Sequence, residues 1–237
     1  MNINRKLGFT VAVAIAAVFP IIFLIIFANI KQPNIQVDTV LPIYGNKTTY
    51  EREDMNGKIV VDTNYHTIPK FSFTNQLGDT ITDDRLKGVV TVVDFFFTTC
   101  PTICIDMAVN KREIQSFFLK DNSKIQILSF TVDPETDTQE RLLDYAYENN
   151  VNSNSWNLVT GDKVAIYDLA RKGFMVTATE GDGGEDDFIH DNKFVLIDRE
   201  KRIRGYYDGT SPEDTERLKK DIQKLSVSYI IPHKEKK

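Results

Sequence analysis

Scarce residue types set the first limits on this chain. Its 237 residues include two cysteines and three histidines, so a site built from soft or nitrogen donors has few members to draw on. Basic residues are not in excess, with 29 Lys and Arg against 34 Asp and Glu, and this balance leaves no basic footprint for a nucleic acid. No cysteine lies near the end of the N-terminal apolar run, so no lipoprotein attachment point is present there. No internal repeat is visible.

The N-terminal segment has the pattern of a membrane anchor. Residues 7–30 are nearly all apolar, and as a helix they would span about 36 Å, enough for a bilayer core of about 30 Å. The run is longer than the core of a cleavable signal peptide and no convincing cleavage site follows it, so we predict an uncleaved single-pass anchor. Arg5 and Lys6 favour a cytoplasmic N-terminus at residues 1–6, with the domain on the extracytoplasmic (periplasmic) side of the inner membrane.

The remainder divides into a tether, a domain and a tail. Residues 31–64 are polar and predict a tether with one short strand at 58–62. Residues 65–226 predict a single domain, and residues 227–237 form a charged tail. Strand and helix patterns alternate through the middle of the domain, which ends in a hairpin and a helix. This order predicts an α/β fold, a central β-sheet with a mixed edge, flanked by helices.

Hydrophobic periodicity and turn signals predict the elements of the domain. The predicted strands are 71–73, 80–82, 89–97, 125–132, 157–160, 174–179, 193–198 and 203–207. The predicted helices are 105–119, which continues from a helix start at the cysteines, 138–149, 162–172 and 211–225. In the second of these we expect the inward side chains to be Leu142, Leu143, Ala146 and Tyr147. The glycine-rich segment 180–187 carries five acidic residues and predicts a loop.

Both cysteines follow a strand that the sequence predicts to be buried. Residues 89–97 are β-branched and aromatic, and the sequence Cys100-Pro101 comes shortly after them. Because proline is favoured in the first turn of a helix, we expect Cys100 at a helix cap and Cys104 one turn inside. Residues four apart share a helix face, so both sulfurs should lie above the end of the strand. Open α/β sheets place their ligand sites there.

Three kinds of chemistry fit this cysteine spacing. A structural disulfide would close a very small loop and would stabilise the fold little. A thiol–disulfide redox pair would gain a thiolate from the helix N-terminus, although such motifs usually have two intervening residues rather than three. A soft-metal site would use two thiolates and a third donor, a set that suits copper.

The third donor would come from one of three histidines. His233 lies in the charged tail, and we expect His66, at the start of the domain, to have a structural role. His190 follows the acidic loop and precedes a predicted strand, so it is the candidate ligand. One imidazole beside two thiolates would form a three-coordinate site able to hold Cu(I) and Cu(II).

Three ordered blocks in the domain resemble the Sco/SenC family, the membrane-anchored copper-binding proteins of cytochrome c oxidase assembly. The blocks are FTTCPTIC at 97–104, TVDPETDT at 131–138 and HDNKFVLID at 190–198. The resemblance implies a thioredoxin-like fold, with copper bound by Cys100, Cys104 and His190. It also implies a partner, which is cytochrome c oxidase subunit II or another copper or thiol protein. The protein would deliver copper to the dinuclear CuA centre of that subunit, or it would reduce the thiols of that centre.

This chain departs from the family pattern at two places. The family often has a proline directly after the second cysteine, where this chain has Ile105, and Thr-Pro-Glu where this chain has Thr138-Gln139-Glu140. Neither change removes a ligand. We expect Asp133 and Asp137 to shape the loop and to cap the helix that follows. The alternative function is a thioredoxin-like thiol–disulfide oxidoreductase that uses Cys100 and Cys104 as its redox-active pair.

Overall fold

The computed structural model describes residue 20 and residues 41–120, 125–176 and 192–228. The residues from 41 onward belong to one unit, Thr39–Lys237. Among the described residues, no helix combines the length and the hydropathy that crossing a membrane requires. The predicted anchor at 7–30, apart from residue 20, and the predicted loop at 180–187 lie outside the described residues.

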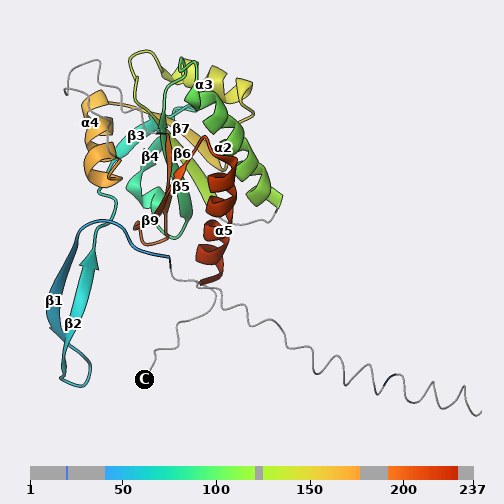
Figure 1. Cartoon of the computed structure of the whole chain (residues 1–237). Coiled ribbons are helices and arrows are strands. Elements are labelled where there is room, and N and C mark those ends of the chain that lie inside the picture. The colour runs from blue at the N-terminus through green and yellow to red at the C-terminus, as the bar shows by residue number, and fades with distance from the viewer. Residues whose placement is uncertain (1–19, 21–40, 121–124, 177–191, 229–237) are drawn as a thin grey trace, which may run out of the picture. The chain divides into compact units, whose positions relative to one another are not determined.

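The main sheet has seven strands in the order β4-β3-β7-β6-β5-β8-β9 (Figure 1). In that order their bounds are Thr80–Thr82, Ser72–Asn75, Trp156–Thr160, Ile125–Thr131, Val90–Phe96, Lys193–Ile197 and Ile203–Asp208. The three central strands β7, β6 and β5 run parallel, and the outer strands pair antiparallel. The structure therefore confirms the predicted α/β sheet with mixed edges.

Helices cover both faces of this sheet. Figure 1 shows α2 and α5 on one side and α4 on the other. The helices are η1 (Asp83–Leu86), α2 (Ile103–Lys120), α3 (Gln139–Glu148), α4 (Lys163–Asp168), the π-helix η2 (Leu169–Gly173) and α5 (Pro212–Ser228). The helix predicted at 162–172 is α4 and η2 together, and the side chain of Asp162 caps it by accepting from the Ala165 N–H at 2.8 Å.

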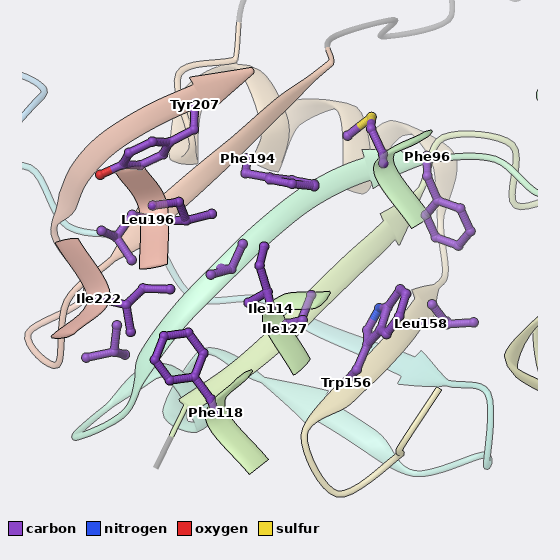
Figure 2. Close-up of a cluster of buried hydrophobic side chains, with 14 of the residues drawn as sticks. Phe96, Ile114, Phe118, Ile127, Trp156, Leu158, Phe194, Leu196, Tyr207 and Ile222 are labelled. Atoms are coloured by element: carbon purple, nitrogen blue, oxygen red, sulfur yellow. The ribbon is translucent and has the colours of Figure 1, made fainter. Parts of the chain in front are cut away.

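Strand β5 separates two hydrophobic clusters because its side chains alternate between the faces of the sheet. Val92 and Phe96 pack with α2, α3 and α5, whereas Val93 and Phe95 pack with α4 and η2. Figure 2 shows the first cluster, in which Phe96 and Trp156 lie near each other. Burying one such side chain contributes about 1.5–3 kcal/mol, so the central strand is fixed from both sides.

The segment before the sheet forms a hairpin where the sequence predicts one short strand. Strand β1 (Lys47–Glu53) pairs antiparallel with β2 (Ile59–Tyr65) in a separate two-stranded sheet. Every residue of β1 is exposed, so it carries no apolar alternation from which a strand could be predicted. An ion pair between Arg52 and Asp62 at 2.8 Å links the two strands.

Two further predictions need correction. In α3 the buried residues are Leu142, Tyr145 and Ala146, whereas Tyr147 is 75% exposed. Tyr145 packs its ring against Phe96, with centroids 5.3 Å apart, and this contact determines which of the two tyrosines lies inside. The strand predicted at 174–179 does not form at residues 174–176, and its remaining residues lie outside the described part of the chain.

Candidate metal and thiol site

The two cysteines lie at the end of β5, as predicted, but the helix starts later than predicted. Helix α2 begins at Ile103, so Cys104 is its second residue and Cys100 lies in the loop before it. The loop first makes a turn in which the Cys100 N–H donates to the Phe97 carbonyl at 3.3 Å. Pro101 therefore precedes the helix instead of occupying its first position. Both thiols are free and each cysteine is 6% exposed.

Hydrogen bonds favour the thiolate form of Cys100. Burial raises the pKa of this thiol, but donors around the sulfur outweigh that effect and the pKa is lowered. The donors are the backbone N–H groups of Thr102 and Cys104, the thiol of Cys104 and the hydroxyl of Thr102. Backbone N–H groups at a helix start are unpaired within the helix, so they are available to an anion.

Cys104 has the opposite tendency. Burial raises its pKa to about 12, and the neighbouring Cys100 sulfur adds to the rise. The backbone N–H of Phe97 and the charge of Lys111 act in the opposite direction. The site therefore pairs one sulfur that ionises readily with one that keeps its proton, and the two are in hydrogen-bond contact.

Asp137 holds the start of the cysteine loop. Its carboxylate accepts from the Thr98 N–H at 3.1 Å, from the Thr98 hydroxyl at 2.5 Å and from the Thr131 hydroxyl at 2.5 Å. Burial raises the pKa of Asp137, and the hydroxyls of Thr131 and Thr98 oppose the rise. The N-cap of α3 is Thr138, whose side chain accepts from the Arg141 N–H, and not Asp133 or Asp137 as the sequence predicted. Asp137 thus joins the ends of β5 and β6 beneath the cysteines.

A third metal donor is not present among the described residues. None of their His, Cys, Asp and Glu side chains form a group of three that could hold a metal ion. His66 places its Nε2 2.7 Å from the Gly173 carbonyl oxygen, in agreement with its expected structural role. His190 and His233 lie outside the described residues.

Contacts tie the start of β8 to the helix that carries Cys104. The Asn110 side chain of α2 donates to the Gly209 carbonyl at 2.7 Å, and the Gly209 N–H donates to the Asn192 carbonyl at 2.6 Å. A Cβ on Gly209 would lie 2.8 Å from that Asn192 oxygen and 3.0 Å from the Met107 methyl carbon. Only glycine therefore allows Asn192 and the first turns of α2 to approach this closely.

A buried charge pair lies in the core beside this site, and the sequence analysis missed it. The Lys111 ammonium of α2 donates to the Asp94 carboxylate of β5 at 2.6 Å and to the Ser129 hydroxyl at 3.1 Å. Asp94 is the one charged residue of a strand that is buried on both faces. That charge was the signal in the sequence, because a carboxylate in such a position needs a buried partner.

The domain matches known proteins over most of its length. The family model of SCO1/SenC matches residues 61–226. The chain is 29% identical over 172 residues to a SCO1 protein homolog of Bacillus subtilis, covering 72% of this chain and 89% of that protein.

Two solved structures share the fold. BsSco, in which a disulfide switch has been identified, is a member of the Sco family of cytochrome c oxidase assembly proteins. It is 30% identical with a TM-score of 0.59, and the match covers 68% of this chain and 94% of that one. ScoI of Bradyrhizobium japonicum, solved with copper bound, has a TM-score of 0.55 at 24% identity. The match covers 67% of this chain and 99% of that one, and it indicates the fold alone. The mixed sheet is thus the thioredoxin-like sheet that the sequence resemblance implied.

Proposed function

The chain belongs to the SCO1/SenC family, and from this we propose that it is a copper chaperone for the assembly of the CuA centre of a respiratory cytochrome c oxidase. Within this proposal it is tethered to the cytoplasmic membrane by residues 7–30, with the domain on the extracytoplasmic side. The apolar run and the two basic residues before it support that location. Its partner would be oxidase subunit II or another copper or thiol protein.

The observation that carries the proposal is the pair of free sulfurs at the helix start. Cys100 and Cys104 are free, buried and in hydrogen-bond contact with each other at the end of β5. Thiolates are soft ligands that suit Cu(I), as they also suit zinc and iron–sulfur clusters. Binding would require both sulfurs to lose their protons, and the N–H donors around Cys100 favour this for the first of them.

We assign the third ligand to His190. In the antiparallel pairing of β5 and β8, Val93 lies opposite Val195, so β8 begins at the end of the sheet where β5 leads to the cysteines. His190 is three positions before Lys193 in the chain. Three extended residues can span about 10 Å, so His190 lies within that reach of the start of β8. The link from Asn192 through Gly209 to Asn110 supports this assignment.

Copper would pass to the partner by ligand exchange. A cysteine of the partner approaches the ion, and one thiolate of this chain leaves as the new thiolate binds. Repetition moves the ion without releasing it to water. The reaction requires the reduced pair, so a disulfide between Cys100 and Cys104 would abolish copper binding.

Substitution of each proposed ligand tests the assignment. We expect Cys100→Ser, Cys104→Ser and His190→Ala each to reduce copper retention, with the cysteine variants also losing the thiolate-to-copper absorption that appears on Cu(II) addition. Metal analysis and absorption spectra of the reduced protein measure both effects. His66→Ala is the matched control, since that imidazole contacts Gly173 and should leave copper retention unchanged. Unchanged copper stoichiometry and affinity in His190→Ala would refute the assignment of that ligand.

A second function, thiol–disulfide oxidoreductase, is supported by the unequal acidity of the two thiols. A lowered pKa at Cys100 and a raised pKa at Cys104 suit a nucleophile and a buried resolving thiol. The two functions differ in their dependence on the histidine. His190→Ala should leave the reduction of a disulfide substrate almost unchanged if the protein is an oxidoreductase, whereas copper retention should fall if it is a chaperone.

A further inference from the structure

We propose that the outer edge of strand β1 is a homodimer interface, at which a second copy of this chain adds its own β1 in antiparallel orientation. The segment that binds is thus the same on both sides, Lys47–Glu53. This surface contains neither cysteine, so its test does not depend on the proposed copper function.

Strand β1 has one paired edge and one open edge. It pairs with β2, and no third strand of the described part of the chain lies beside it (Figure 1). Just before β1, the Asn46 carbonyl accepts from the His66 N–H at 2.9 Å, and just after it, the Asp54 N–H donates toward β2. Backbone groups of an antiparallel strand alternate in direction, so every second residue between Asn46 and Asp54 points away from β2. These outward-facing residues are Lys47, Thr49, Glu51 and Glu53.

The hairpin has little else to stabilise it. Every residue of β1 is exposed, and no residue of β2 is fully buried. Two-stranded hairpins are only marginally stable in water unless further strands or a helix pack with them. A second β1 would complete a four-stranded sheet in the order β2-β1-β1-β2, and it would pair the backbone groups of the open edge.

The sequence of β1 is complementary to itself in the antiparallel register that pairs the whole strand. This register places a two-fold axis at Tyr50. The pairs across the interface are Lys47–Glu53, Thr48–Arg52, Thr49–Glu51 and Tyr50–Tyr50. Lys47 lies opposite Glu53 of the second copy, twice by symmetry, and no like charges lie opposite each other. Such opposite-charge and aromatic pairs stabilise neighbouring strands.

The charges at this edge are available for pairing. Arg52 already has a partner in its own chain, Asp62 at 2.8 Å. Lys47 and Glu53, by contrast, form no ion pair with another residue that the structure describes. Both side chains are exposed, so a second copy could reach them without a change in the domain.

The charge pattern selects β1 over the other edge of the hairpin. Charged side chains at an edge usually oppose strand addition. Strand β2 shows this effect, because the register that pairs the whole of β2 with a second copy has its axis at Asp62 and places two carboxylates opposite each other. In β1 the charges attract in the corresponding register. A strand of an unrelated protein would need no such self-complementarity, so the pattern favours a second copy.

Cross-linking of the full-length protein in detergent tests the geometry. In the proposed dimer the two Cβ atoms of residue 50 are about 5 Å apart. Those of residue 64, on β2, are at least three strand spacings apart, about 14 Å. We expect Tyr50→Cys to form a disulfide-linked dimer with oxidised glutathione, which takes up the two electrons and two protons that the new S–S bond releases. Asn64→Cys, an exposed position on the same face, is the control and should form none.

Both variants carry Cys100→Ser and Cys104→Ser, so that the native thiols cannot contribute. Non-reducing electrophoresis measures the linked fraction. The absence of a linked dimer in Tyr50→Cys would overturn the proposal. That result is also the one expected if another segment of this chain, or a different protein, covered the edge.

Charge reversal tests the complementarity. Lys47→Glu places glutamates opposite each other in the dimer, and Glu53→Lys places lysines opposite each other. We expect each variant alone to dimerise about tenfold more weakly than the parent. An equimolar mixture of the two variants restores both opposite-charge pairs, so dimerisation should return to nearly the parent affinity. Lys58→Glu, an exposed position next to the hairpin turn, is the control and should leave dimerisation unchanged.

Sedimentation equilibrium in density-matched detergent measures the dimerisation affinities. A seven-residue strand pair is a small interface, so we expect a concentration-dependent equilibrium between monomer and dimer. A dimer that is insensitive to the charges at positions 47 and 53 would overturn the proposal, because association through the N-terminal apolar run would behave in that way. Recovery in the mixture would support it, since only two copies of this chain can exchange these charges. If the parent binds no copper, the proposed chaperone function fails, and these measurements still decide the interface.

Discussion

The two sulfurs have the same chemistry and nearly the same exposure, but their surroundings differ. Cys100 accepts hydrogen bonds from backbone N–H groups at the start of α2, while Cys104 is enclosed by the hydrophobic cluster and hydrogen-bonds through its thiol to Cys100. Hydrogen-bond donors stabilise a thiolate, whereas apolar surroundings destabilise it. The difference between the two positions therefore arises from a few atoms of the loop and the first helical turn.

This difference predicts unequal alkylation of the reduced protein. At neutral pH we expect iodoacetamide to modify Cys100 much faster than Cys104, because the thiolate is the nucleophile and the pKa of Cys104 is raised to about 12. Peptide mass spectrometry after timed quenching measures both rates. A faster rate at Cys104 would contradict the hydrogen-bond pattern described for the loop.

A second prediction at this scale concerns the ion pair between Asp83 and Lys201, 2.7 Å apart and mostly buried. The hydrogen bond from Lys201 lowers the pKa of Asp83 below its ordinary value, with burial opposing. The pair therefore stabilises the fold above the ordinary Asp pKa, and this contribution is lost as the pH falls through the lowered value.

We expect Asp83→Asn to reduce the free energy of unfolding by about 1–3 kcal/mol at pH 7 and to have a smaller effect at an acid pH below the lowered pKa of Asp83. Urea titrations at both pH values measure the difference. Asp84→Asn is the control, because its pair with Lys87 is exposed and such pairs contribute about 0–1 kcal/mol. An effect of Asp83→Asn that stays constant with pH would show that the ion pair is not its cause.

At the scale of elements, the site depends on two strands that run in opposite directions. Strand β5 ends where the cysteine loop begins, and its antiparallel neighbour β8 begins at that same end. Helix α2 is then fixed to the β8–β9 hairpin through Asn110, Gly209 and Asn192. A purely parallel sheet would place the start of the neighbouring strand at the opposite end.

Asn110 tests this arrangement. We expect Asn110→Ala to lower the free energy of unfolding by about 1–3 kcal/mol, because a buried carbonyl loses its donor, and also to weaken copper binding. Gln115→Ala removes a buried amide of the same helix that bonds to Asn150 and Asn152, so it should cost similar stability without changing copper affinity. Chemical unfolding and chelator competition measure the two quantities. Equal copper affinities in the two variants would contradict a link between Asn110 and the site.

The sequence predicted the central elements better than the loops between them. The runs that became β5 and β6 are apolar and β-branched, and burial on both faces leaves them few alternatives. The predicted start of α2 is too early because Cys100 and Pro101 have the local sequence of a helix start. The hydrogen bonds of Thr98 to Asp137, 39 residues away, hold the loop outside the helix, and the local sequence does not show them. Strand β1 has no apolar pattern, and the Lys111–Asp94 pair joins residues whose proximity only the packing of α2 on β5 creates.

At the scale of the molecule, both hydrophobic clusters and the cysteine site lie within one unit, Thr39–Lys237. The described core draws on residues from Leu41 to helix α5. The segment that we propose as an anchor would then determine where the protein is located, while the rest determines what it binds.

A fragment of residues 39–237 should therefore behave as an independent domain. We expect it to unfold in one cooperative transition and to bind copper with the affinity of the full-length protein in detergent. Circular dichroism during heating and chelator competition measure these properties. A fragment that lacks cooperative unfolding, or that loses copper affinity, would show that the N-terminal segment contributes to the fold or to the site.

The boundary of α2 falls between the two cysteines, and this has a mechanical consequence. The Cys104 sulfur belongs to a helix, whereas the Cys100 sulfur belongs to a short turn before that helix. Closing the covalent S–S bond requires the sulfurs to approach to about 2 Å, and bracketing an ion requires them to separate again. We therefore expect the turn that carries Cys100, and not helix α2, to change its dihedral angles between the two separations.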